Sequence, residues 1–348
     1  MANKLDKKIL HGMVNYGTQA GVLALGLRNR GVEAMAIVYP DKMKRLCDLE
    51  LLGGGNFLQK IIKYSWNHLR SIYWFFYFDI FHFYYGITLF PRQLDLPFYK
   101  IFRKKVVMHY LGNDVQGYER SVSQYKWTNM PGYMEGRDPK KYDQFIEKRL
   151  SNESRYVDLQ LVCAPYLSEF VPRSKIFPLA LNLERYQFKD LASGTTIKIL
   201  HAPSHRGIKG TEFIIETINK LISQGFSINF RCIENVSHDQ LLEHYAWCDL
   251  FIDQIMGGWY GTAAIEAMAV GRPVVCSIRE SYFAHIDYGL EIPILHADPD
   301  SIFLVLKKIV SDAHELQELG LKSRKFVEKF HDSNYLTQKL IQMYRELE

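Results

Sequence analysis

The stretch that decides the fold covers residues 249–277 and reads DLFIDQIMGGWYGTAAIEAMAVGRPVVCS. An apolar run at 250–252 comes first and is typical of the end of a buried strand. A loop with three glycines follows, and then strong helix formers from 263 to 269. A glycine and a proline end this helix, and a second apolar run at 274–276 predicts another strand. The order strand, glycine loop, short helix and strand is that of a βαβ crossover.

Two interpretations of this crossover stay open. Backbone N–H groups at the start of a helix suit a phosphate. Thr262 is the expected cap of the helix, and Glu266 lies one turn inside, where a carboxylate can hold a pair of sugar hydroxyls. In the ordinary alternative, which a glycine loop alone favours, the glycines only make a turn.

A second loop earlier in the same half of the chain carries two cations. The predicted strand 197–200 leads into HAPSHRGIKG, and the predicted helix 211–224 follows. Arg206 and Lys209 lie in this loop, where fixed positive charge suits a diphosphate whose negative charge grows as it leaves. The alternative is two solvated surface cations. Because this loop accompanies the glycine loop, we favour a ligand site.

The first half of the chain opens with another βαβ unit. It consists of a strand at 8–13, a loop at 15–19, a helix at 20–30 and a strand at 33–38. The glycines of this region do not have GxGxxG spacing, which argues against a dinucleotide-binding oxidoreductase. Gly17 therefore belongs either to a plain turn or to a loop that faces a ligand.

His109 ends the predicted strand 105–110, at the edge where open α/β sheets place ligand groups. A lone histidine there is equally compatible with a structural role. Residues 116–141 are polar and rich in glycine, proline, tyrosine and charge, which predicts a long loop that is either functional or mobile. An interdomain linker is expected at 181–194.

The aromatic residues gather in the first half of the chain. The helix predicted at 57–69 has apolar residues near helical spacing, with lysines and an arginine beside them. The ordinary expectation is that this stripe faces the core, and the alternative is a membrane-surface helix. The aromatic run 71–90 is long enough for a membrane span, but Asp79, His82 and Gly86 interrupt it. We expect a buried strand at 79–84 instead.

Composition sets the remaining bounds. The 348 residues favour two domains, and the net charge of +5 is too small to indicate nucleic acid. The five cysteines have no CxxC spacing, which predicts reduced thiols and no zinc site. The N-terminus MANKLDKK lacks the apolar core of a signal peptide, so a cytoplasmic protein is expected.

The second half of the chain resembles glycosyltransferases of the GT-B fold, and in particular the retaining glycosyltransferase family four. The resemblance rests on HAPSHRGIKGT (201–211) and GGWYGTAAIEAMAVGRPVV (257–275), and more weakly on FDIFHFYY and MHYLGNDV in the first half. It implies an α/β protein with two Rossmann-like domains that face each other across a cleft. The domains would be 1–180 on the acceptor side and 181–332 on the nucleotide-sugar side, with 333–348 as a helix returning to the first domain.

The resemblance also implies roles for individual residues. Glu266 matches the second Glu of the family's Glu-x7-Glu motif, which holds the nucleotide ribose. The implied catalytic residues are His109, Arg206 and Lys209, and the implied donor-binding residues are Gly17, Gly258, Tyr260, Gly261, Thr262 and Glu266. Gly258 stands where the family often has its first Glu, so a carboxylate that grips the donor sugar is missing. The spacing from Arg206 to Lys209 is also shorter than the common pattern.

These observations predict a retaining, metal-independent glycosyltransferase that moves a sugar from a nucleotide-diphosphate sugar to a glycan acceptor. The nucleotide sugar would be a co-substrate, and no cofactor is expected. The expected setting is bacterial surface polysaccharide or lipopolysaccharide synthesis. The expected acceptor is a glycan or a lipid-linked glycan. Peripheral contact with the inner face of the cell membrane is an open alternative to a purely cytoplasmic protein. The rival functions are a GT-B sugar-nucleotide epimerase and a degenerate subunit that binds sugar nucleotides without catalysis.

Overall fold

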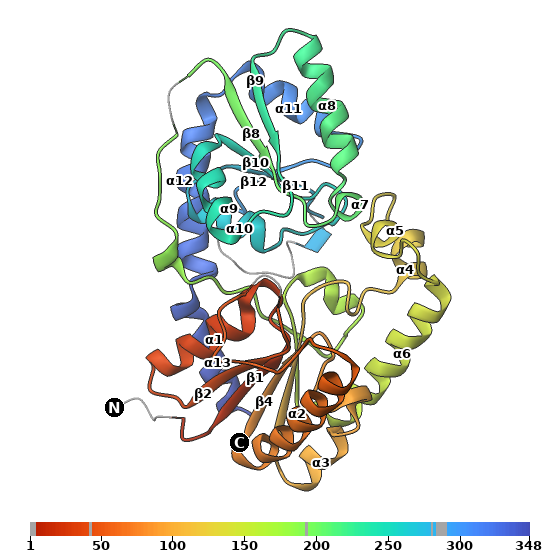
Figure 1. Ribbon diagram of the computed structural model, residues 1–348. Helices are drawn as coiled ribbons and strands as arrows, with labels where there is room; N and C mark the ends of the chain where they lie inside the picture. Colours follow the sequence, from red (N-terminus) through yellow and green to blue (C-terminus); the bar gives the residue numbers. More distant parts are fainter. Residues whose placement is uncertain (1–4, 42–43, 192–193, 280, 283–290) are drawn as a thin grey trace. The chain divides into compact units, whose positions relative to one another are not determined.

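The computed structural model describes residues 5–41, 44–191, 194–279, 281–282 and 291–348 (Figure 1). The chain divides into two compact units. Unit 1 consists of residues 1–116, 144–180 and 333–348, and unit 2 consists of residues 117–143 and 181–332. The predicted linker 181–194 includes two positions, 192–193, that lie outside the described residues.

Unit 1 is built on a seven-stranded parallel sheet in the order β3-β2-β1-β4-β5-β6-β7. Its strands are β1 (Ile9–Met13), β2 (Ala34–Val38), β3 (Leu49–Glu50), β4 (Ile80–Tyr84), β5 (Lys105–Tyr110), β6 (Leu159–Val162) and β7 (Lys175–Ile176). Every residue of β1 and β4 is buried, as expected for parallel strands that are covered on both faces. The predicted strands of the first half are therefore confirmed to within a residue of their ends.

The helices of unit 1 include the last helix of the chain. They are α1 (Gln19–Asn29), α2 (Phe57–Tyr77), α3 (Leu96–Ile101), most of α6 (Pro139–Tyr156) and α13 (Ser333–Arg345). Helix α13 packs against α1, where Gly26 lies so close to Thr337 that a methyl group at Gly26 would lie 2.3 Å from the Thr337 hydroxyl oxygen. Leu336, Leu340 and Tyr344 of α13 belong to the hydrophobic core of unit 1. The predicted return of the last helix to the first domain is thus confirmed.

Unit 2 has a five-stranded parallel sheet in the order β12-β11-β10-β8-β9. Its strands are β8 (Ile197–His201), β9 (Ile228–Cys232), β10 (Leu250–Ile252), β11 (Val274–Cys276) and β12 (Ile294–His296). Its helices are α4 (Tyr118–Gln124), α5 (Met130–Tyr133), α7 (Arg206–Lys209), α8 (Thr211–Ser223), α9 (His238–Trp247), α10 (Thr262–Ala269), α11 (Ile302–Ser311) and α12 (His314–Phe330). Both units are therefore α/β with parallel sheets, as the sequence predicts.

Residues 116–141 differ from the prediction of a long loop in the first domain. They form α4, α5 and the start of α6, and 117–143 belong to unit 2. The reason is a set of contacts that the sequence does not reveal. Asp300 accepts hydrogen bonds from Lys126 (2.5 Å) and the Trp127 indole (2.8 Å), and Gly132 lies against Gly207.

The aromatic region 57–90 forms a long helix followed by a strand. Helix α2 runs to Tyr77 and β4 covers Ile80–Tyr84, which confirms the strand expected at 79–84. Among the described residues, no helix has both the length and the apolar composition that a membrane crossing needs. The expectation that the apolar stripe of 57–69 faces the core is wrong, because Phe57, Ile61, Ile62, Trp66 and Leu69 are all exposed.

Candidate functional site

The carboxyl end of β8 is fixed by a buried histidine. His201 Nδ1 lies 2.8 Å from the carbonyl oxygen of Ile252 at the end of β10, and its Nε2 lies 2.9 Å from the hydroxyl of Thr211. Burial lowers the pKa of His201 to about 4, so the ring is neutral at pH 7. A neutral ring that donates from Nδ1 and accepts at Nε2 satisfies both contacts. His201 therefore ties the strand that precedes one loop to the strand that precedes the other.

The two loops meet at Lys209. Its ammonium lies 2.7 Å from Oδ1 of Asp253 and 3.4 Å from Oε1 of Gln254, both of which follow directly after β10. The other carboxylate oxygen of Asp253 accepts from the N–H of Gly261, at 3.4 Å, just before α10. The lysine of the first loop is thus held beside the start of the helix that follows the glycine loop. The structure brings Lys209, Gly261 and Thr262 together.

Arg206 lies on the same turn, α7, but points to other partners. Its guanidinium lies 2.9 Å from Glu212 and 3.1 Å from Glu234. The Arg206 side chain is 41% exposed, against 13% for Lys209. The hydrogen bonds to Glu212 and Glu234 raise the pKa of Arg206 further. The structure therefore does not pair the two cations: Lys209 faces the α10 start, and Arg206 is held by carboxylates at the surface.

The glycine loop has a shape that depends on Gly258. This residue has φ of +101°, which favours glycine, and a Cβ there would lie 2.5 Å from Cζ of Arg279. The Arg279 guanidinium lies 3.4 Å from the centre of the Tyr125 ring. Arg279 thus occupies the space next to the position where the resemblance places a carboxylate. The sequence gives no sign of this arginine's role, because it comes 21 residues after Gly258.

Tyr260 and Thr262 are placed differently from their expected roles. Tyr260 is buried, and its hydroxyl lies 3.1 Å from Nε2 of His331, so the side chain points into the core of unit 2. Thr262 is the first residue of α10, and the cap position is Gly261, so the prediction that Thr262 caps the helix is wrong. Gly261 has an extended backbone and no side chain caps the helix, while its own N–H donates to Asp253. The first N–H groups of any helix lack partners within the helix. At the start of α10, these N–H groups are the feature that suits an anion.

Glu266 lies on α10 inside a hydrogen-bond network. Its Oε1 lies 2.9 Å from the Tyr186 hydroxyl and 3.0 Å from Nε2 of His238, and its Oε2 lies 3.5 Å from the Tyr245 hydroxyl. Burial, together with the charge of Glu266, raises the pKa of Tyr186 well above its usual value. The carboxylate is therefore held in one orientation. Tyr186 and His238 lie 80 and 28 residues away, so no sequence spacing reveals this network.

The two candidates of unit 1 have different surroundings. Gly17 lies in the 3-10 turn after β1 with φ of +57°, and its carbonyl accepts from the side chain of Gln19. His109 is fully buried, and its Nδ1 lies 3.4 Å from Nε2 of His82. Burial lowers the pKa of His109 to about 3. In this structure the His109 ring is a neutral part of the core, and its side chain presents no surface to a ligand.

His109 belongs to a polar cluster in the core of unit 1. His11 and His82 are register partners on β1 and β4, and their rings stack at 4.6 Å. His11 contacts the hydroxyls of Tyr84 (2.7 Å) and Tyr344 (3.2 Å), and Tyr344 also contacts His82 at 2.7 Å. These hydrogen bonds join the sheet to α13 and explain why polar side chains are tolerated there.

Two further features bear on the chemistry. None of the five cysteines forms a disulfide bond. In the described part of the chain, no group of three or more His, Cys, Asp or Glu side chains is arranged to hold a metal ion.

No protein-family model matches the sequence, and no curated protein matches it either. Solved structures do match over nearly the whole chain. A glycosyltransferase from Rickettsia africae is 13% identical, with a TM-score of 0.64 over 99% of each chain. HepE from Anabaena, solved in complex with UDP-glucose, is 11% identical, with a TM-score of 0.61 over 98% of this chain and all of HepE. A UDP-N-acetylglucosamine 2-epimerase is 13% identical, with a TM-score of 0.54 over 99% of this chain and 97% of the epimerase.

At these identities the likeness concerns the fold. Each neighbour matches the chain along almost its full length, so both α/β units take part in the likeness. The fold is GT-B, with two Rossmann-like units, as the sequence predicts. The solved structures that share this fold thus include glycosyltransferases as well as an epimerase.

Proposed function

We propose that the protein is a glycosyltransferase that moves a sugar from a nucleotide-diphosphate sugar to a glycan acceptor. The observation that carries the proposal is the position of Lys209 beside the start of α10, at the carboxyl ends of the neighbouring strands β8 and β10. Ligands of parallel α/β sheets bind outside the carboxyl ends of the strands. An ammonium and helix N–H groups at one point suit a diphosphate.

Lys209 has a donor to spare for such a ligand. An ammonium has three N–H donors, and Asp253 and Gln254 accept from two of them. The third donor and the first N–H groups of α10 would hold the diphosphate and stabilise the negative charge that grows as the sugar leaves. Each well-placed donor of this kind contributes about 2.7–4 kcal/mol to transition-state stabilisation. Arg206 can contribute only by leaving Glu212 and Glu234.

Glu266 would hold the ribose hydroxyls of the donor. Tyr186 and His238 fix the direction of its carboxylate, which reduces the cost of ordering that side chain when the nucleotide binds. Gly17, in the loop after β1, would contribute backbone to the donor or acceptor. We also propose retention of configuration and metal-independent transfer, which the resemblance of the 257–275 stretch supports. The acceptor is proposed to be a surface glycan, either free or linked to a lipid.

An epimerase is the second candidate, because a UDP-N-acetylglucosamine 2-epimerase shares the fold over almost the whole chain. A subunit that only binds nucleotide sugars is the third, since Gly258 stands where the resemblance places a carboxylate that grips the donor sugar, with Arg279 beside it. A screen of UDP, GDP, ADP and CDP by melting temperature comes first, followed by product analysis with the matching nucleotide sugar. Acceptor-dependent release of the nucleotide supports a transferase. A changed sugar without acceptor indicates an epimerase, and binding without any product indicates a binding subunit.

A further inference from the structure

Up to Ser71, helix α2 has its polar and apolar sides reversed relative to an ordinary surface helix. Such a helix turns its apolar stripe to the core. On α2 the buried residues are Asn67, Ser71, Trp74 and Phe75. Large apolar side chains occupy the outer surface over the whole length of the helix: Phe57, Leu58, Ile61, Ile62, Tyr64, Trp66, Leu69, Ile72, Tyr73 and Phe76. Exposed apolar surface of this extent marks a binding face.

Helix α3 and the turn before it extend the same face. Leu94 is 67% exposed and Ile101 is 69% exposed, and Phe98 and Phe102 are about half exposed. The Phe102 ring contacts Phe76 of α2 at a centroid distance of 5.6 Å. A groove of about 290 Å³ runs between the two helices, lined by Ile72, Phe75, Phe76, Phe90, Leu94, Asp95, Phe98 and Phe102. An apolar groove of this volume has room for a short length of hydrocarbon chain.

The charged residues of the chain segment that carries this face are mostly positive, although Glu33 accepts a hydrogen bond from Tyr77 at the end of α2. Residues 51–113 contain eight Lys and Arg, two Asp and no Glu. Asp95 is buried and accepts hydrogen bonds from Thr88 and Tyr99, and Asp79 lies 3.8 Å from Lys104. Apolar surface together with basic residues is the composition of faces that lie on anionic membranes.

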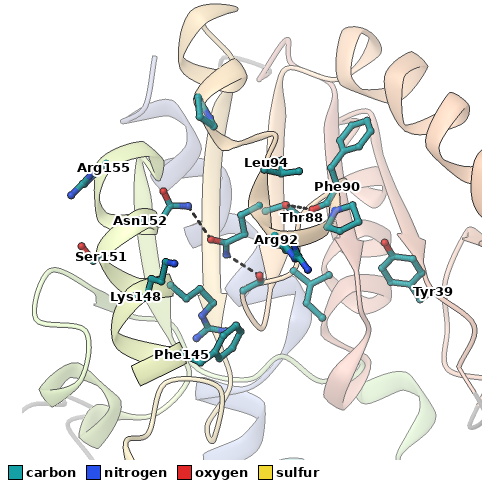
Figure 2. A pocket seen from close by; sticks show the side chains of 16 residues that line it. Tyr39, Thr88, Phe90, Arg92, Leu94, Phe145, Lys148, Ser151, Asn152 and Arg155 are labelled. Atoms are coloured by element: carbon teal, nitrogen blue, oxygen red, sulfur yellow. Dashed lines mark hydrogen bonds between the residues drawn. The ribbon is translucent and has the colours of Figure 1, made fainter. Parts of the chain in front are cut away.

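A cavity of about 930 Å³ adjoins the groove between the turn 86–97 and α6 (Figure 2). Phe90 and Leu94 line both the cavity and the groove, so the two lie side by side. Arg92 of the turn and Lys148 and Arg155 of α6 are among the residues that line the cavity. Within the described residues, none of these three cations forms an ion pair. A fourth cation of the lining, Arg149, pairs with Glu153. A cavity lined by three further cations beside an apolar groove fits a phosphate attached to a hydrocarbon chain.

We propose that unit 1 docks on an anionic bilayer through the exposed face of α2 and α3, and that the cavity beside it binds the phosphate headgroup of a membrane lipid. The hydrocarbon chain leaves the cavity past Phe90 and Leu94 and follows the groove. The inference extends the proposed lipid-linked acceptor, and its test measures lipid binding without any transfer reaction. Failure to bind lipid and failure to transfer sugar are therefore separate results.

The test is sedimentation of the full chain with vesicles of phosphatidylcholine alone and of phosphatidylcholine mixed with phosphatidic acid. The wild type is expected to bind the mixed vesicles and to lose most of this binding at high salt. Replacing Ile62 and Leu69 with serine should weaken binding about 10-fold or more. The matched control replaces Ile222 and Leu304 of unit 2, which are also exposed, with serine and should bind like the wild type.

A second pair of variants tests the cavity. The triple variant Arg92→Gln/Lys148→Gln/Arg155→Gln should bind the mixed vesicles about 10-fold more weakly or worse. The control Lys307→Gln/Lys308→Gln/Lys325→Gln removes the same charge from exposed positions of unit 2 and should bind like the wild type. Melting temperature checks that all variants are folded, and the nucleotide-induced melting shift should be the same in each.

Four outcomes would overturn the proposal. The first is a wild type that does not bind mixed vesicles even at low salt. The second is equal loss of binding in the unit 1 variants and their controls. The third is complete displacement of the protein from the vesicles by inorganic phosphate at an ionic strength at which sodium chloride leaves it bound, since the cavity would then take free phosphate. The fourth is a stable dimer in light scattering that the Ile62→Ser/Leu69→Ser variant separates, since a second copy would then cover the face.

Discussion

Replacing Lys209 with methionine should reduce both stability and activity, and a second substitution separates the two effects. The side chains of Lys209 and Asp253 are 13% and 2% exposed, and their charged atoms are 2.7 Å apart. Removing one partner of a buried ion pair costs about 3–5 kcal/mol, because the other charge stays buried without compensation. We expect about 3 kcal/mol here, since Lys209 is partly exposed. For a unit of this size that corresponds to a fall in melting temperature of roughly 6–12 °C.

The double variant Lys209→Met/Asp253→Asn removes the buried charge as well. The asparagine oxygen can still accept from the Gly261 N–H, so most of the lost stability should return. Turnover should not return, because the ammonium that would stabilise the leaving diphosphate is missing in both variants. A contribution of about 2.7–4 kcal/mol to the transition state corresponds to a loss of roughly 100–1000-fold in kcat/KM.

The assay is release of nucleotide from the nucleotide sugar that the melting screen selects, measured beside thermal unfolding. The reasoning is refuted if turnover recovers together with stability in the double variant. Lys209 would then only support the fold by neutralising Asp253. Equal stability of the single variant and the wild type would contradict the buried ion pair itself.

Three further predictions address other parts of the two units. Gly258→Glu should lower the free energy of unfolding by roughly 1–3 kcal/mol without raising turnover. The reason is that φ of +101° strains any residue other than glycine and that Arg279 occupies the space where the new side chain would lie. A stable variant with higher turnover would contradict this. Glu266→Gln should weaken nucleotide binding by about 10–150-fold in calorimetry, since hydrogen bonds to a charged group contribute about 1.5–3 kcal/mol. The control Tyr245→Phe should bind the nucleotide normally, because the Tyr245 hydroxyl lies 3.5 Å from Glu266. His11→Asn should become more stable relative to the wild type as the pH falls. Burial lowers the pKa of His11 to about 3, so between about pH 6.5 and 3 only the unfolded wild type binds a proton at this residue. The wild type therefore loses about 1.4 kcal/mol of unfolding free energy per pH unit in this range, and the variant does not. Parallel stability curves of the two proteins between pH 6 and 4 would show that the ring is protonated in the folded state.

Helix α2 shows where pattern and fold diverge. The spacing of Phe57, Ile61 and Leu69 predicts a helix correctly, because periodicity is a property of the local sequence. Periodicity also predicts one apolar side, but it does not say whether that side meets the sheet or the solvent. The structure buries Asn67 and Ser71 instead: Asn67 hydrogen-bonds both the N–H and the carbonyl of Leu52. That choice depends on a partner 15 residues away.

In the candidate site, too, the local sequence predicts the elements, and contacts between distant segments decide which side chains meet. Short-range signals place Lys209 after one strand and Gly261 before a helix, and the sequence predicts both elements correctly. Asp253 could have been noticed as an acid directly after a buried strand, yet its partner could not, since Lys209 lies 44 residues earlier. Arg206 is equally basic in the sequence, and only the positions of Glu212 and Glu234 direct it away from the site.

By itself the sequence determined the order of most strands and helices, the parallel α/β class of both units and the glycine loop at 257–261. These features follow from apolar runs, helix formers and chain breakers that act within about ten residues. Only the tertiary structure decided that the two loops meet at Lys209, that Arg279 lies against Gly258 and that the apolar side of α2 faces outward. Those outcomes depend on contacts between distant segments, whose free energies arise only when the sheets have formed.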